Sequence, residues 1–66
     1  MTPADERRLQ RFDAFVRGVH DELQQTEAQM RELADAGRTR TATYQQLMAN
    51  RMTLRQIVDR LEDAGL

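Results

Sequence analysis

The chain has 66 residues, which leaves room for one domain with a small core. It contains no cysteine and a single histidine, which excludes disulfide bonds and thiolate metal sites and argues against a metal centre. The formal net charge of −1 argues against a general nucleic-acid binder, because such proteins normally carry a clear basic excess.

The first predicted helix starts at TPADE, residues 2 to 6. Thr2 is a typical N-cap and Pro3 suits the first helical position, and the two acidic residues that follow favour the positive end of the helix dipole. Gly37 is placed to end the helix, so we expect it to cover residues 3 to 36. Apolar or small residues recur along it in alternating steps of three and four, which is the spacing of a heptad seam: Leu9, Phe12, Val16, Val19, Leu23, Thr26, Met30 and Leu33.

A connector is expected at residues 37 to 42 and a second helix at residues 43 to 64, with Gly65 as its stop. Three threonines precede this helix, and Thr43 with Gln46 matches a capping box. Its apolar face covers close to half of the helix circumference, whereas contact with one neighbour needs a stripe of roughly 100°. The residues of that face are Tyr44, Leu47, Met48, Leu54, Ile57, Val58 and Leu61.

A short connector favours an antiparallel hairpin of a long first helix and a shorter second helix. Counting outward from the bend places Val16 near Glu62, so the second helix ends while Leu9 and Phe12 still lack a neighbour. Exposed apolar surface of this kind usually marks an interaction site. The sequence therefore predicts an all-α fold in which two hairpins form a homodimeric four-helix bundle. The expected dimer interface is Leu9, Phe12, Phe15, Val16, Val19, Leu47, Leu54, Ile57, Val58 and Leu61.

The charges near the two chain ends are opposite in sign. Three arginines lie near the start of the first helix, and three acidic residues lie near the end of the second, where they are unfavourable to the helix dipole. We expect the two groups to lie side by side, either within one protomer or across the dimer. They are Arg7, Arg8 and Arg11 on one side and Asp59, Glu62 and Asp63 on the other.

The connector has a second possible use. Arg38, Thr39, Arg40 and Thr41 combine two guanidinium groups with hydroxyls and the free amides of a helix start, which can bind an anion or a protein partner. Short polar loops of this composition are also ordinary connectors, and this plainer interpretation is the one we favour.

Residues 49 to 66, ANRMTLRQIVDRLEDAGL, contain a polar residue, then Thr-Leu-x-x-Ile-Val-x-x-Leu and a final Gly-Leu. This pattern resembles the recognition helix of winged-helix regulators of the MarR type. The resemblance implies that Asn50 caps the helix and that several polar side chains face DNA: Thr53, Arg55, Gln56 and Arg60. No turn signal separates Leu47 from Thr53, so DNA or phosphate binding is kept as the alternative function.

The chain has neither serine nor cysteine and no glycine-rich phosphate loop, so we expect no enzymatic activity and no cofactor. We expect a small helical protein-interaction module that forms a homodimer and serves an unidentified protein partner as an adaptor, assembly or regulatory subunit. The polar, acidic start and the lack of a long apolar run predict a cytoplasmic protein that does not enter the membrane.

Overall fold

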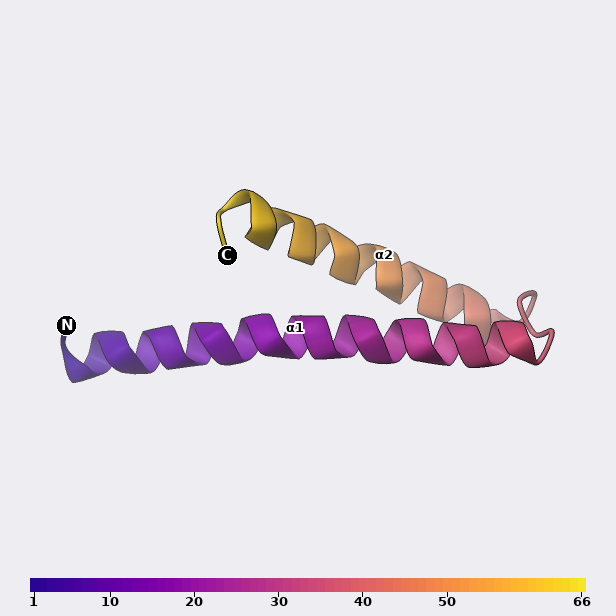
Figure 1. The fold of residues 1–66 in the computed structure, drawn as a ribbon, viewed down its shortest axis with the longest axis horizontal. Coiled ribbons are helices and arrows are strands. Elements are labelled where there is room, and N and C mark those ends of the chain that lie inside the picture. Colours follow the sequence, from indigo (N-terminus) through magenta and orange to yellow (C-terminus); the bar gives the residue numbers. More distant parts are fainter.

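The computed structural model describes all 66 residues as two antiparallel helices joined by a short connector (Figure 1). Helix α1 spans Pro3–Asp35 and helix α2 spans Ala42–Asp63. The prediction of an all-helical hairpin with a longer first helix is confirmed. The molecule measures 53 × 20 × 15 Å, and its long dimension is the length of α1. Neither helix is long and apolar enough to cross a membrane.

Each helix begins at a threonine cap. At the start of α1, the Asp5 amide donates to Thr2 Oγ1 at 3.2 Å and the Thr2 amide donates to Asp5 Oδ2 at 3.3 Å, which completes a capping box. At the start of α2, the Tyr44 amide donates to Thr41 Oγ1 at 3.2 Å. The capping box predicted at Thr43 is therefore wrong, because Thr43 already lies inside the helix that Thr41 caps.

Each helix also ends at a glycine with a positive φ angle, +71° at Gly37 and +83° at Gly65. Beyond each glycine the next amide bonds back over the last turn: Arg38 N to Leu33 O at 2.7 Å, and Leu66 N to Leu61 O at 2.8 Å. These are Schellman motifs, in which a left-handed residue lets the chain reverse while the last carbonyls keep their partners. The first reversal builds the connector, and the second turns Leu66 back toward α1.

The core of the hairpin is small. Val19 and Leu23 of α1 pack with Leu54 and Val58 of α2, and Ile57 lies partly buried against them. Thr26 and Met30 are the other two buried residues, so only six of the 66 residues are buried. Beside this core, an ion pair joins Arg55 Nη2 to Glu27 Oε2 at 3.7 Å.

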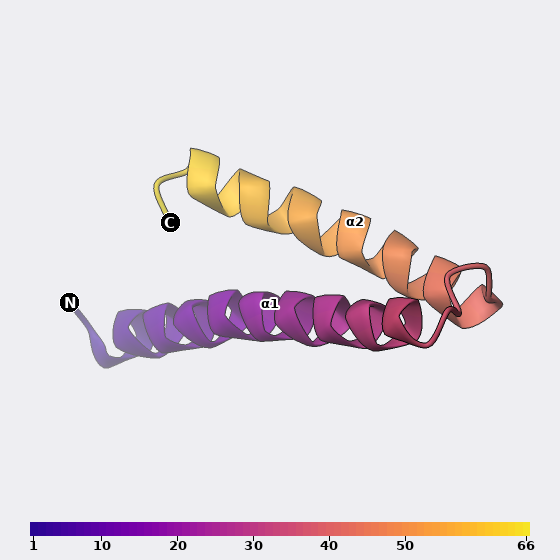
Figure 2. The ribbon, with the colours of Figure 1, turned by 45° about the vertical axis from the view of Figure 1, so that its right-hand side comes forward.

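The two helices lie close together at the connector and diverge toward the end that carries both termini (Figures 1 and 2). We call this end, made of residues 3–17 and 59–66, the open end of the hairpin. The residues of the core cluster lie between the connector and the open end, so the burial they provide does not extend to the first turns of α1.

Candidate interaction surface

The open end exposes large apolar side chains of α1. Leu9 is 48% exposed and Phe15 is 53% exposed, while Phe12 and Val16 are half-buried. Helix α1 extends past the end of α2, so its first turns, which carry Leu9, have no second helix beside them (Figure 1). Phe15 lies outside the heptad seam and points away from the core. A contiguous apolar surface on a small helical protein usually marks a binding site.

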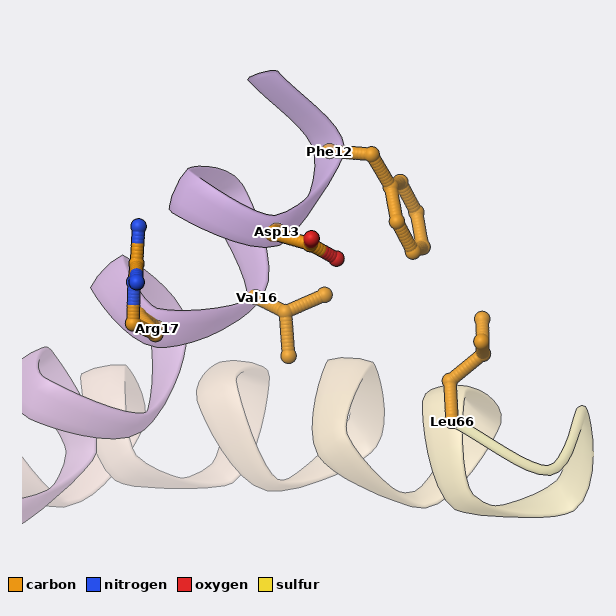
Figure 3. A pocket seen from close by; sticks show the side chains of 5 residues that line it. All are labelled: Phe12, Asp13, Val16, Arg17 and Leu66. Carbon is orange, nitrogen blue, oxygen red and sulfur yellow. The ribbon is translucent and has the colours of Figure 1, made fainter. Parts of the chain in front are cut away.

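An open crevice of about 380 Å³ lies at this end, between the first half of α1 and the last residue of the chain. Phe12 and Val16 point toward Leu66 in Figure 3, and Asp13 and Arg17 line the same crevice. The expectation that Phe12 lacks any neighbour is therefore corrected, because the turn at Gly65 brings Leu66 beside it. Leu66 itself remains 59% exposed, so the crevice is only partly covered by the chain.

The ten residues of the predicted dimer interface fall into two groups. Val19, Leu54 and Val58 are buried within the core of one hairpin, where they need no second chain to leave water. The other seven keep exposed surface in the single chain: Leu9, Phe12, Phe15, Val16, Leu47, Ile57 and Leu61.

A second group of exposed apolar side chains lies on the flank of α2. Met48 is 38% exposed and Met52 is 59% exposed, and their spacing of four places them on the same side of the helix. Sequence reasoning placed Met48 at the edge of the apolar face and missed Met52. The Met-x-x-x-Met spacing was the signal that could have found this pair.

The charged groups of the open end form no ion pair within the chain. The Arg55–Glu27 pair is the single ion pair of the structure, so none of the three arginines at the start of α1 lies within 4.0 Å of a carboxylate. The prediction that they pair with the acids near the end of α2 is therefore not met within one protomer. The unpaired residues are Arg7, Arg8 and Arg11 on α1 and Asp59, Glu62 and Asp63 on α2.

The connector uses its backbone and one hydroxyl to join the two helix ends. The Thr41 hydroxyl donates to the Arg38 carbonyl at 2.9 Å while it also accepts from the Tyr44 amide. The Arg38 amide closes the end of α1, so this residue satisfies the helix through its main chain rather than its guanidinium. The side chains of Arg38, Thr39 and Arg40 are exposed and make no hydrogen bond or ion pair.

The region that resembles a DNA-recognition helix is the continuous second half of α2. Asn50 lies inside the helix, where its Oδ1 accepts from Gln46 Nε2 at 3.3 Å, so the cap predicted at Asn50 is wrong. Thr53 donates to the Ala49 carbonyl at 3.2 Å, and Arg55 is engaged with Glu27. Gln56 and Arg60 are exposed without hydrogen bonds or ion pairs.

A second cavity, of about 150 Å³, lies between the helices near the connector. It combines acidic, basic and phenolic groups with two apolar side chains: Glu27, Met30, Arg31, Ala34, Tyr44 and Arg51.

Comparison of the chain with protein-family models, curated proteins and solved structures gave no match. The function of the chain is therefore inferred from the exposed apolar surface and the charges of the open end.

Proposed function

We propose that this chain is a non-enzymatic helical protein-interaction module that works as a homodimer, in the role of an adaptor, assembly or regulatory subunit. The observation that carries the proposal is the uncovered apolar surface of the open end. Six buried side chains are few for a folded domain, and chains of this length that lack disulfides and metals usually need a further stabilising contact. A second copy supplies that contact without any other component.

The unpaired charges support the same proposal. Charged side chains at the rim of an apolar contact guide the orientation of association more than they add affinity. Here Arg8 and Arg11 lie seven and four residues before Phe15, so they share one side of α1 with this exposed ring. In the proposed dimer, the two arginines lie at the rim of the interface and Phe15 belongs to its apolar centre.

Within this proposal, the flank of α2 with Met48 and Met52 is the surface left for another protein. Methionine side chains are flexible and polarizable, and they suit surfaces that adapt to a partner helix. We assign the self-association to the open end because its exposed apolar side chains lie beside charges that have no ion-pair partner and adjoin the small core.

The test is sedimentation equilibrium combined with circular dichroism over a dilution series. We expect a reversible dimer whose helical signal falls as the chain is diluted, because association and folding share the same apolar surface. A compact helical monomer that keeps its signal at every concentration would overturn the proposal. The alternative function is tested by titrating duplex DNA at low salt, where binding that weakens steeply with added salt would indicate phosphate contacts instead.

A further inference from the structure

We infer that the dimer is antiparallel, with the open ends of the two hairpins interlocked so that the start of α1 in each copy lies against the end of α2 in the other. This inference rests on the proposed function, because it requires that the chain dimerise. It names the occupant of the open end, a second copy of this chain, and fixes its direction.

The three arginines lie near the start of α1, before the residues that line the crevice. The chain reverses at Gly65, and its last residue reaches Phe12 and Val16. Arg7 and Arg8 lie at least one helical turn before Phe12, and the start of α1 extends past the end of α2 (Figure 1). No carboxylate of the same chain lies within 4.0 Å of them, so their guanidinium groups are free to pair with carboxylates of a second copy.

Each charged cluster is unfavourable on its own helix. Arg7 and Arg11 are four residues apart, as are Asp59 and Asp63, and like charges at this spacing repel each other. The acids also face the negative end of the α2 dipole. The repulsion within each cluster is therefore offset when the cluster of opposite charge lies beside it.

The two directions of packing differ in the charges that they bring together. In a parallel dimer, with both connectors at one end, the arginines of one copy lie beside the arginines of the other and remain past the end of both α2 helices. In an antiparallel dimer, the start of α1 runs alongside the end of α2 in the second copy, and by symmetry this contact occurs twice. Only the antiparallel direction brings the basic and acidic clusters together.

The apolar surface of the open end favours the same direction. The crevice lined by Phe12, Val16 and Leu66 opens at the same end, between helices that diverge there (Figures 1 and 3). Leu9 lies in the first turns of α1, which have no second helix beside them, and Phe15 is exposed farther along the same helix. Reciprocal insertion places these side chains at the open end of the other copy, so that one contact covers both surfaces.

The test uses two charge-reversed variants. One carries Arg7→Glu, Arg8→Glu and Arg11→Glu, and the other carries Asp59→Arg, Glu62→Arg and Asp63→Arg. Glutamate and arginine are both good helix formers, so a lost dimer does not simply reflect a lost helix. We expect each variant alone to sediment as a weaker dimer or a monomer. An equimolar mixture is expected to form a tight heterodimer, because both contacts are again between opposite charges.

The direction is measured separately with a spin label on Thr39→Cys, an exposed connector position in a chain that has no other cysteine. At a rise of 1.5 Å per residue, antiparallel open ends place the two labels more than about 50 Å apart. A parallel bundle, with helix axes 8–10 Å apart, places them within roughly 25 Å.

The outcomes separate the two proposals. A wild-type monomer would overturn the dimer and the inference together. A wild-type dimer with short label distances would leave the proposed function standing and overturn the antiparallel direction. A wild-type dimer whose charge-reversed variants dimerise unchanged, or fail to combine in the mixture, would overturn the pairing of the clusters.

Discussion

The exposure of Phe15 gives a quantitative prediction for the variant Phe15→Gln. The side chain is 53% exposed in the single hairpin, so about half of its surface remains to be buried by a second copy. Complete burial of a phenylalanine contributes about 1.5–3 kcal/mol, so half of it contributes about 0.8–1.5 kcal/mol per copy. The dimer therefore loses about 1.5–3 kcal/mol of association free energy, which raises Kd by roughly tenfold to a hundredfold.

The measurement is sedimentation equilibrium of Phe15→Gln beside Met52→Gln as a matched control. Met52 is exposed to a similar extent, at 59%, but it lies in the middle of α2 and outside the open end. Glutamine is a good helix former, so neither change weakens the helix itself. We expect the control to keep the wild-type Kd. If Phe15→Gln and Met52→Gln give the same Kd, the open end is not the dimer contact and the reasoning from exposed surface is refuted.

Two further predictions concern the helix ends, and both are measured as shifts in thermal unfolding by circular dichroism. Gly37→Ala should lower the free energy of unfolding by about 1 kcal/mol, because alanine is strained in the left-handed backbone of this position. Gly18→Ala should raise it by about 0.5–1 kcal/mol, because Gly18 is helical and a Cβ there meets nothing within 4 Å. Equal effects of the two changes would contradict the assigned turn. Thr41→Ala should cost about 1 kcal/mol as the loss of an N-cap, and Thr43→Ala should cost nothing, so a larger loss at Thr43 would restore the capping box predicted from the sequence.

The elements of the fold could be read from local signals in the sequence. Thr2 before Pro3, the alternation of three and four along α1, and glycine at positions 37 and 65 are each decided by interactions within a few residues. The choice between Thr41 and Thr43 was not decidable in this way. It depends on the Arg38 carbonyl, which reaches the Thr41 hydroxyl only after the turn at Gly37 has formed.

The binding surface was predictable only in part, because the apolar stripe of a helix does not show whether it packs against the same chain or against another molecule. Val19, Leu54 and Val58 have the same spacing signal as Phe12 and Val16, yet the first three pack inside the hairpin. What separates them is their distance from the connector, since side chains near the connector meet the other helix of the same chain. The return of Leu66 to α1 also depends on a backbone reversal whose direction the side-chain pattern does not encode.

The two ends of the hairpin differ in how their structure is held, and this difference links binding to folding. At the connector, the turn closes the end of α1 and the Thr41 hydroxyl joins it to the start of α2. At the open end, no ion pair joins the helices, and Leu66 beside Phe12 covers the crevice only in part. An isolated helix is marginal in water unless its apolar face is packed, so the first turns of α1 gain most from a second copy. Dissociation of the dimer and fraying of these turns should therefore be one coupled process, in which the free energy of association includes the cost of ordering this segment.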